Sequence, residues 1–344
     1  MKVLVAMSGG VDSSLAAALL VDQGHVVFGG TLRLVDHPPT ADAPDPAAAA
    51  AALGIPFTRW DLRDEFERLV VSPFTAAYAA ARTPNPCALC NARVKFGLLL
   101  EKARELGADA LATGHYAGIA PASGGAPRLV RGVDRRKDQS YFLFAIRRSA
   151  LPMVLFPLGG FTKDAVRAMA RARGLAAAER AESQEICFVP GDDYAGFLAS
   201  RSLAGAFVPG AVVDTSGRRL GEHRGLANYT VGQRRGLGFA TGRPLYVVAL
   251  DAASNELVVG ADSELWRRDL VAGSANWLVD VPEREFRAAV RIRSRHEPAP
   301  ATLAPAADGG SWRVLFDESQ RAITPGQAAV FYDGETVLGG GWIQ

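Results

Sequence analysis

The chain has 344 residues and a formal net charge of +2, and 49% of its residues are hydrophobic while 22% are charged. These proportions exclude an intrinsically disordered or strongly basic chain, and the length predicts two or three globular domains. No apolar stretch approaches membrane-spanning length, and the run after Lys2 is too short for a signal peptide. We therefore expect a cytoplasmic protein without a membrane partner.

The first predicted unit is a strand, a glycine turn and a helix. Residues 3–7 form a short apolar, β-branched run, Ser8-Gly9-Gly10 turns the chain, and an alanine- and leucine-rich helix follows as far as Gly24. A helix that begins directly after such a turn presents free backbone N–H groups and the positive end of its dipole, which together favour a phosphate or pyrophosphate. The turn contains no lysine, so it does not match the loop of phosphoryl-transfer NTPases.

Predicted strands and helices alternate as far as about residue 200. We expect strands at residues 26–32, 56–60 and 108–113 and helices at residues 47–53, 64–81 and 91–106. This alternation predicts right-handed βαβ units and an α/β domain built on a doubly wound parallel sheet. Because ligands of such sheets bind at the carboxyl ends of the strands, the first turn and residues 113–115 should face one nucleotide.

Short strands replace the helices in the rest of the chain. We expect an α/β domain over residues 1–200, a small, mostly β central domain over residues 201–270 and a C-terminal β-barrel over residues 271–344. In the barrel, four arginines share parity along a predicted strand at residues 286–295, namely Arg287, Arg291, Arg293 and Arg295. Side chains of one parity project from one face of a strand, so these arginines are expected to form a phosphate-binding face for RNA.

The three cysteines are too few and odd in number for a disulfide framework. Two prolines predict a loop over residues 83–91, which places Cys90 beside the N-cap of the following helix. The positive end of that helix would lower the pKa of the thiol and favour a nucleophilic thiolate. An inert buried thiol is the alternative, and it is the ordinary interpretation of Cys187 considered alone. No further Cys or His residues stand at zinc-site spacing.

Six motifs occur in order along the chain: S-G-G-V-D-S-S, T-P-N-P-x-x-x-C-N, A-T-G-H-Y, K-D-Q-S-Y-F-L, S-Q-x-I-C-F and T-x-G-Q-R-x-G-L-G. Together they resemble the tRNA-specific 2-thiouridylases (the MnmA family), PP-loop enzymes of the N-type ATP pyrophosphatase class, over essentially the whole chain. The resemblance implies an ATP-dependent enzyme that thiolates C2 of the wobble uridine of certain tRNAs. It implies that ATP is cut to AMP and pyrophosphate, and that a donor protein supplies sulfur as a persulfide.

The resemblance also implies roles for single residues. Cys90 would be the nucleophile and Cys187 would accept the sulfur as a persulfide, and one route leaves a Cys90–Cys187 disulfide. The residues expected to hold ATP are Ala6, Met7, Ser8, Gly9, Gly10, Val11, Asp12, Ser13, Leu32 and Gly114. Those expected to meet the tRNA are Asn85, Pro86, Cys87, His115, Lys137, Asp138, Gln139, Arg293, Ser294 and Gln327, the first three at the target base.

The cofactors leave alternatives open. Asp12 could orient a magnesium ion on the pyrophosphate or could merely cap its helix. Cys87 stands where many relatives have aspartate, and Ser294 stands where some have tyrosine, so the contributions of these two positions differ here. The three cysteines could alternatively ligate three irons of a 4Fe–4S cluster whose fourth iron carries sulfide, but we favour the persulfide relay because aspartate at position 87 of relatives argues against an obligatory third thiolate.

Two other functions use some of the same features. A different PP-loop enzyme, such as an ATP-dependent amidotransferase or ligase, would need the phosphate loop but neither Cys90 nor Cys187. A nucleotide-responsive RNA-binding protein without catalysis would need the loop and the basic residues only. Serine substitution at each cysteine separates the first alternative, and pyrophosphate release on addition of tRNA separates the second.

Overall fold

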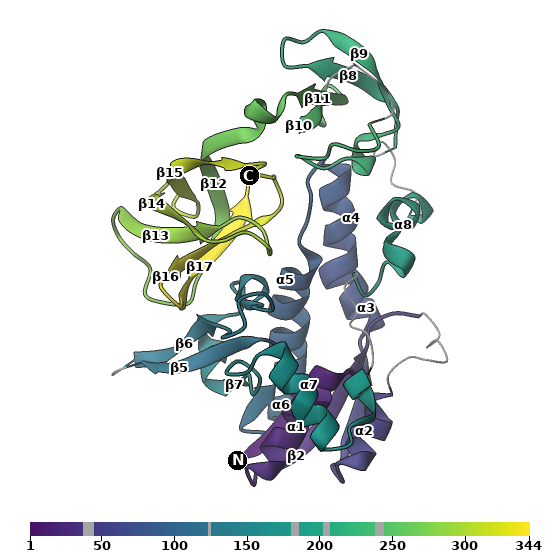
Figure 1. Ribbon diagram of the computed structural model, residues 1–344, viewed down its shortest axis with the longest axis vertical. Helices are drawn as coiled ribbons and strands as arrows, with labels where there is room; N and C mark the ends of the chain where they lie inside the picture. The colour runs from purple at the N-terminus through teal and green to yellow at the C-terminus, as the bar shows by residue number, and fades with distance from the viewer. Residues whose placement is uncertain (37–44, 123–124, 180–185, 202–206, 238–243) are drawn as a thin grey trace.

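A computed structural model describes residues 1–36, 45–122, 125–179, 186–201, 207–237 and 244–344. The N-terminal part of the described chain, at the bottom of Figure 1, contains a five-stranded parallel sheet in the order β3-β2-β1-β4-β7. Its strands are β1 (Lys2–Ala6), β2 (Val26–Arg33), β3 (Phe57–Asp61), β4 (Ala110–Ala112) and β7 (Val154–Leu155). The strand order reverses between β1 and β4, which makes their carboxyl ends the expected ligand site.

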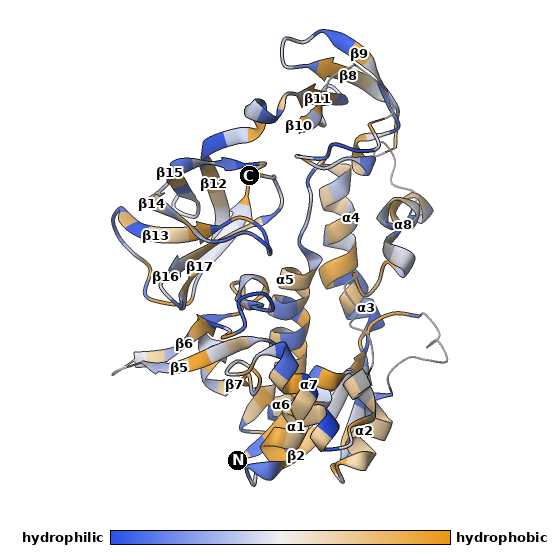
Figure 2. Ribbon diagram, viewed as in Figure 1, coloured by the Kyte–Doolittle hydropathy of each residue, from blue (hydrophilic) through white to orange (hydrophobic). Residues whose placement is uncertain are grey.

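Helices cover both faces of this sheet because its strands are apolar on both sides. Val3 and Val5 of β1 pack with residues of helices α1 and α2, whereas Leu4 packs in a second cluster with the helical segments that follow Cys90. Figure 2 shows that α1 and β2 are largely hydrophobic. Two-sided burial of this kind is typical of a strand in a parallel sheet. It places the start of α1 next to the carboxyl end of β1.

Two long helices of the described N-terminal part contain a π-helical segment each, labelled η1 and η2. The helical elements are α1 (Val11–Asp22), α2 (Pro46–Ala52), α3 (Arg63–Phe66), η1 (Glu67–Val71), α4 (Ser72–Ala79), α5 (Pro86–Cys90), η2 (Asn91–Leu99), α6 (Leu100–Glu105), α7 (Lys163–Ala172) and α8 (Tyr194–Ser200). Short 3-10 turns are η3 (Ser140–Phe142), η4 (Arg148–Met153), η5 (Ala176–Glu179), η6 (Pro190–Asp192), η7 (Leu226–Asn228) and η8 (Asp262–Leu265). The segments α5, η2 and α6 follow one another without a break, so one long helix runs from Pro86 to Glu105.

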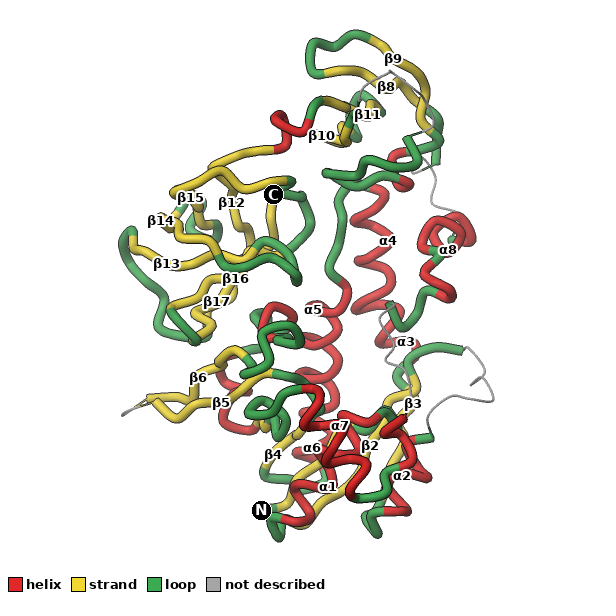
Figure 3. Tube along the Cα trace, viewed as in Figure 1, coloured by secondary structure: helices red, strands yellow, loops and turns green. Residues whose placement is uncertain are grey.

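The rest of the described chain is mostly β (Figure 3). The central sheet has the order β10-β11-β8-β9, with β8 (Gly210–Asp214), β9 (Arg219–His223), β10 (Tyr246–Asp251) and β11 (Glu256–Gly260). In the described C-terminal part, six antiparallel strands close into a barrel: β12 (Trp266–Trp277), β13 (Phe286–Arg291), β14 (Ala299–Pro305), β15 (Trp312–Arg321), β16 (Ala328–Asp333) and β17 (Thr336–Ile343).

A hairpin of the N-terminal part joins the barrel to the α/β part of the molecule. Strands β5 (Ala117–Ala122) and β6 (Gly125–Arg131) extend the barrel sheet, because Val130 pairs with Thr336 of β17. One hydrophobic cluster continues across this junction, with Phe96 and Leu111 on one side and Val330 and Tyr332 on the other. The barrel is therefore packed against the α/β part rather than tethered by a linker alone.

The predicted fold class is confirmed: a parallel α/β sheet is followed by a small, mostly β region and a β-barrel. One expectation about local structure was wrong. The prolines do not keep residues 83–91 out of a helix, since α5 begins at Pro86 with Asn85 as its N-cap. Proline is well tolerated at the first position of a helix, where its missing N–H is not needed. In the described ranges, no helix is both long and apolar enough to cross a membrane.

Candidate functional site

The phosphate loop follows β1 at the carboxyl edge of the sheet. Met7 donates its backbone N–H to Gly30 O at 2.7 Å, which aligns the end of β1 with β2. Ser13 Oγ accepts from Ser8 N at 3.1 Å and donates to Gly10 O at 3.1 Å, so one hydroxyl closes the turn. Gly9 adopts a positive φ of 76°, which its lack of a Cβ permits. Gly10 is the N-cap of α1 and supplies no capping side chain, which leaves the first N–H groups of the helix for an anion.

A cavity of about 300 Å³ lies beside this loop. Seven of the ten residues expected to hold ATP line the cavity: Ala6, Met7, Ser8, Asp12, Ser13, Leu32 and Gly114. Gly9, Gly10 and Val11 complete the loop but do not line the cavity. The other lining residues are Gly30, Thr31, Leu34, Lys95, Leu99, Thr113, His115 and Gln139. We call the wall formed by the loop, Leu32 and Gly114 the nucleotide end of the cavity.

Position 114 requires glycine because its backbone lies very close to the backbone of Asp12 and Ser13. A Cβ at this position would lie 2.8 Å from Asp12 C and 2.9 Å from Ser13 N. Real Cβ atoms do not approach backbone this closely, so any larger residue would push β4 and its following turn away from α1. The glycine therefore lets the ends of β1 and β4 form one site.

Asp12 lies in the first turn of α1 but does not cap it. Its carboxylate accepts hydrogen bonds from Lys163 Nζ at 2.7 and 2.8 Å and from Tyr116 Oη at 2.8 Å. The Lys163 side chain, at the start of α7, is only 8% exposed, whereas that of Asp12 is 32% exposed toward the cavity. A carboxylate whose oxygens already bind a lysine and a hydroxyl does not fit a direct magnesium ligand. The contact of Lys163 with Asp12 was not predicted, because no local sequence pattern indicates which distant segment a helix lysine contacts.

Cys90 is buried in a hydrophobic cluster, 8% exposed, with Phe66, Phe74 and Val94 around it. Because α5 begins one turn earlier than predicted, the thiol does not lie at the positive end of a helix. Burial raises the pKa of Cys90 to about 12, with a smaller opposing effect from the charge of Lys95. The predicted lowering of this pKa was therefore wrong, because desolvation by the apolar cluster outweighs the favourable charges.

Cys187 lies on the segment that packs over Cys90. The ring of the next residue, Phe188, makes edge contacts with Phe66 at 5.6 Å and with Phe74 at 5.1 Å between centroids. Cys87 and Cys187 are exposed, and all three cysteines are free thiols. Although both residues are exposed by surface area, the protein atoms packed around their sulfurs desolvate the thiolates, which raises the pKa of Cys87 and of Cys187. Both thiols are also close enough for their charges to raise the pKa of Cys90.

The fold thus brings together the three cysteines, which we call the sulfur end of the site. Leu32 and Leu34 connect it to the nucleotide end, since both line the cavity and also pack on the cluster that contains Cys90. The described residues contain no group of three His, Cys, Asp or Glu side chains that could hold a metal ion.

The residues expected at the target base and at the tRNA have mixed surroundings. Asn85 and Pro86 are buried, and Asn85 Oδ1 accepts from Ala88 N at 3.2 Å as the cap of α5. His115 is buried, its Nδ1 lies 2.7 Å from Thr113 Oγ1, and burial holds its pKa well below the usual range. Gln139 lines the cavity and accepts a bond from Tyr116 N at 2.9 Å. Lys137, Arg293 and Ser294 retain partial exposure.

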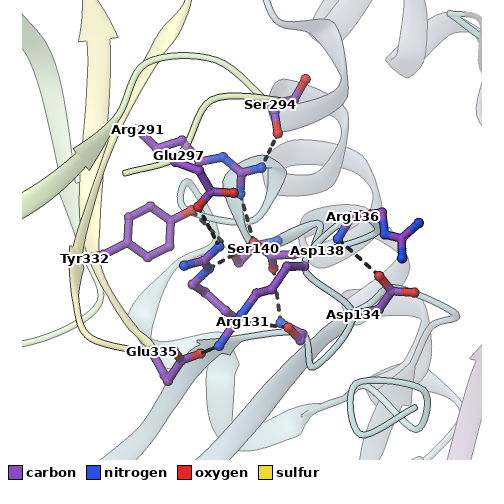
Figure 4. A network of polar contacts seen from close by, with 12 residues as sticks. Arg131, Asp134, Arg136, Asp138, Ser140, Arg291, Ser294, Glu297, Tyr332 and Glu335 are labelled. Atoms are coloured by element: carbon purple, nitrogen blue, oxygen red, sulfur yellow. Dashed lines mark hydrogen bonds and ion pairs between the residues drawn. The ribbon is translucent and has the colours of Figure 1, made fainter. Parts of the chain in front are cut away.

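Asp138 is committed to the junction with the barrel rather than to solvent. Its side chain is fully buried and pairs with Arg291 at 2.8 Å and Arg131 at 3.4 Å (Figure 4). Ser140 Oγ donates to the same carboxylate at 3.0 Å and lies 3.2 Å from Tyr332 Oη of β16. The carboxylate accepts from two backbone N–H groups as well. These contacts tie the K-D-Q turn to strands β13 and β16, and we call them the barrel clamp.

The predicted basic face of the barrel strand was wrong. Strand β13 ends at Arg291, so Arg293 and Arg295 lie in the following turn and not on the same face. Arg291 is buried in the barrel clamp, and exposed Arg287 pairs with Asp317. Gln327 of the barrel instead reaches residues 83–85, which lead into α5 and which we call the cysteine loop. Its Nε2 donates to Thr83 O at 3.1 Å and Pro84 O at 3.2 Å.

Comparisons with known proteins agree with this geometry. Three family models match the chain: "tRNA methyl transferase HUP domain" at residues 1–191, "tRNA methyl transferase PRC-barrel domain" at residues 197–261 and "Aminomethyltransferase beta-barrel domain" at residues 267–343. The chain is 51% identical to the tRNA-specific 2-thiouridylase MnmA of Syntrophotalea carbinolica, over 99% of this chain and 98% of that protein. It is 48% identical to the protein of the same name from Geotalea uraniireducens, over 100% and 95% of the two chains, and 50% identical to that from Chloroflexus aurantiacus, over 99% and 98%.

Proposed function

The chain belongs to the MnmA family of tRNA-specific 2-thiouridylases, and we propose that it converts the wobble uridine of tRNA to 2-thiouridine as an ATP-dependent tRNA-uridine 2-sulfurtransferase. The observation that carries this proposal is the connection between the two ends of the site. The phosphate loop lines the cavity and the Cys90 cluster lies behind its wall, because Leu32 and Leu34 line the cavity and also pack on that cluster. A PP-loop ligase or a non-catalytic RNA-binding protein would need no such connection.

The nucleotide end performs the first step. Uridine O2 attacks the α-phosphorus of ATP, the bond to the β-phosphate breaks, and pyrophosphate leaves with the electron pair. The N–H groups at the start of α1 and the Ser8 and Ser13 hydroxyls are suited to bind the phosphates, with Gly114 permitting the close approach. AMP attached to O2 then becomes a good leaving group where oxygen alone is a poor one. Magnesium would arrive on the phosphates themselves, since the Asp12 oxygens are already bonded.

The sulfur end performs the second step. An exposed Cys187 is suited to receive sulfur from a donor protein as a persulfide. The terminal sulfur of that persulfide then attacks C2, and the C2–O2 bond breaks as AMP leaves. Cys90 next attacks Cys187 Sγ, the S–S bond breaks with its electron pair passing to the sulfur on C2, and 2-thiouridine is released while a Cys90–Cys187 disulfide forms. In the alternative route, Cys90 attacks the inner sulfur and releases hydrosulfide, which attacks C2; the resulting Cys90–Cys187 disulfide must be reduced before the next cycle. Burial raises the pKa of Cys90 to about 12. This favours an order in which Cys187 is loaded first and Cys90 attacks the inner sulfur of its persulfide afterwards.

The remaining assignments belong to the same proposal. We assign residues 1–200, 201–270 and 271–344 to the catalytic, central and barrel domains. The nucleotide site comprises Ala6–Ser13, Leu32 and Gly114, while Asn85, Pro86, Cys87, His115, Lys137, Gln139, Arg293, Ser294 and Gln327 are assigned to the tRNA side. Asp138 is reassigned to the barrel clamp because its carboxylate is fully buried. We place the reaction in the cytoplasm, where ATP and tRNA are both available.

Purified protein, ATP, a persulfide source and a tRNA transcript provide the test. Nucleoside mass spectrometry should detect 2-thiouridine, and AMP and pyrophosphate should appear in step with it. Formation of ADP and orthophosphate instead would contradict the proposed chemistry. A tRNA-dependent pyrophosphate release without thiolation would favour a different PP-loop enzyme.

Serine substitutions separate the sulfur relay from the iron–sulfur alternative. Cys90→Ser and Cys187→Ser should each abolish thiolation, whereas Cys87→Ser should retain substantial activity because the relay needs two sulfurs. If a 4Fe–4S cluster carries the sulfide, Cys87→Ser should be as inactive as the other two variants. Anaerobically purified protein would then also contain iron and absorb visible light.

A further inference from the structure

Lys95 lies between the two ends of the site. It belongs to η2, the helical segment that directly follows Cys90, and its side chain lines the cavity together with Ser8, Leu32 and His115. The i→i+5 bonding of a π-helix places residues five apart about one turn from each other, so Cys90 and Lys95 occupy successive turns on one helix. Irregular helical segments of this kind are frequent at functional sites.

The cavity needs a cation that the phosphate loop does not supply. Among its described lining residues, Lys95 is the only lysine or arginine. His115 does not replace it, because burial and the charge of Lys95 hold the pKa of that imidazole well below its usual range. The remaining charged lining residue is Asp12, whose carboxylate is already neutralised by Lys163. A triphosphate in this cavity would therefore meet one available side-chain cation.

The charge of Lys95 also acts on the sulfur end. It lowers the pKa of Cys90, Cys87 and Cys187, in each case against the larger effect of burial. An ammonium that acts on the thiols and also lines the nucleotide cavity lies near the point where the nucleotide and the sulfur must meet. In the proposed reaction that point is the α-phosphate, which is joined to uridine O2 just before sulfur attacks C2.

We propose that Lys95 is a catalytic residue whose ammonium binds a non-bridging oxygen of the α-phosphate in both steps of the reaction. This inference rests on the proposed function and names a contact within it. When O2 attacks the α-phosphorus, negative charge accumulates on the non-bridging oxygens before pyrophosphate departs, and the ammonium stabilises it. When sulfur attacks C2, the electrons of the breaking C2–O2 bond pass to AMP, and the same ammonium stabilises the departing phosphate. Lys95 remains protonated throughout and transfers no proton.

Lys102 provides a matched control on the same long helix. It lies in α6, outside the cavity, and its ammonium pairs with Glu105 on the surface at 2.8 Å. Lys102→Met should therefore leave thiolation unchanged. Lys95→Met should lower the rate of 2-thiouridine formation by about 10²- to 10³-fold, the effect of removing one preorganised charge-stabilising donor. Lys95→Arg, which keeps the charge, should recover part of that loss.

The two diastereomers of adenosine 5′-O-(1-thiotriphosphate) test the contact itself. Wild-type protein should prefer one diastereomer, because sulfur at one non-bridging position disrupts the bond to the ammonium, and Lys95→Met should lose most of that preference. Circular dichroism melting of each variant checks the fold, and Lys95→Arg provides the answer if Lys95→Met does not fold. Thiolation by Lys95→Met within threefold of wild type, or an unchanged preference in a folded variant, would overturn the inference. Failure of wild-type protein to thiolate tRNA would instead overturn the proposed function.

Discussion

The nucleotide end and the sulfur end of the site are preorganised to different degrees. At the nucleotide end, Ser8, Ser13 and Gly10 already bond one another, and the first N–H groups of α1 point at an anion site. At the sulfur end, burial keeps Cys90 protonated. The first end is assembled by residues within one short segment, whereas the second is assembled by residues nearly one hundred positions apart. Under the proposed function, ATP would therefore bind a finished site, while the sulfur chemistry would wait for a loaded Cys187.

This difference has a functional logic. A thiolate exposed beside an activated nucleotide would attack it or be oxidised, whereas a protonated thiol inside an apolar cluster does neither. The barrel contributes to the sulfur end through Gln327, which holds the carbonyls that precede α5, and the barrel clamp fixes the K-D-Q turn, whose Gln139 lines the cavity. Variants that affect one end and spare the other test this comparison.

The largest expected effect concerns Cys90 in the double variant Cys87→Ser/Cys187→Ser. A thiol with a pKa of about 12 is about 10³-fold less ionised at pH 8 than one with an ordinary pKa, so alkylation by iodoacetamide should be slower by about that factor. The rate should rise about tenfold per pH unit from pH 7 to pH 10, because ionisation stays far from completion. A rate that levels off below pH 9 would show that the thiol is already prepared, and the contrast between the two ends would disappear.

Breaking the barrel clamp should give the next largest effect. Arg291→Ala removes one partner of a buried ion pair and should lower the free energy of unfolding of the barrel by about 3 kcal/mol. Arg287→Ala on the same strand removes an exposed pair with Asp317 and should cost less than about 1 kcal/mol. Urea denaturation measures both when it is followed by the fluorescence of the barrel tryptophans Trp266, Trp277, Trp312 and Trp342. ATP affinity should stay unchanged in each variant, and a loss in Arg291→Ala would mean that the barrel also shapes the nucleotide end.

The two ends of the site differ in how much of their structure could be predicted from the sequence alone. The turn of the phosphate loop was predictable because the bonds that close it join residues within one segment of the chain, from Ser8 to Ser13. The surroundings of Cys90 were not, since they depend on Phe66, Phe74 and Phe188 from separate elements. One signal was available: asparagine followed by proline marks the start of α5 and should have placed Cys90 inside the helix.

The cations show a second limit of sequence reasoning. Lys163 and Lys95 look like ordinary helix-surface lysines. Only the packing of α7 on α1 gives Lys163 its partner, and only the position of η2 beside the cavity places Lys95 in its wall. The prediction that the barrel arginines share one face was wrong for a related reason. Parity holds only while a strand continues, and β13 ends at Arg291, where the chain turns back.

Gly114→Ala should damage the nucleotide end selectively. The new methyl group would meet the backbone of Asp12 and Ser13 below 3 Å, and separating the two segments should weaken ATP binding by about 10- to 100-fold. Gly160→Ala is the matched control, because a Cβ there meets nothing within 4 Å. Isothermal titration with ATP measures both, and persulfide loading of Cys187 should be normal in each. An affinity within threefold of wild type would show that α1 can shift without cost.

The smallest expected effect separates two roles of Gln327. If this side chain positions the cysteine loop through its bonds to Thr83 O and Pro84 O, Gln327→Ala should lower kcat for thiolation by about three- to tenfold, the value of one or two hydrogen bonds. The KM for ATP and the affinity for tRNA should then be unchanged. Gln320→Ala is the control, since the Gln320 amide donates to Glu318 O within its own strand.

A direct tRNA contact gives a different pattern in the same Gln327→Ala variant. The affinity for tRNA would fall while kcat at saturating tRNA stayed near that of wild type, because the cysteine loop would keep its position. Single-turnover thiolation at saturating tRNA, combined with a filter-binding titration, distinguishes the two outcomes. We expect the loss in kcat, because the amide nitrogen is already bonded to both loop carbonyls before any tRNA arrives. That result would place the barrel among the elements that build the sulfur end, and a loss in affinity alone would assign it to tRNA recognition.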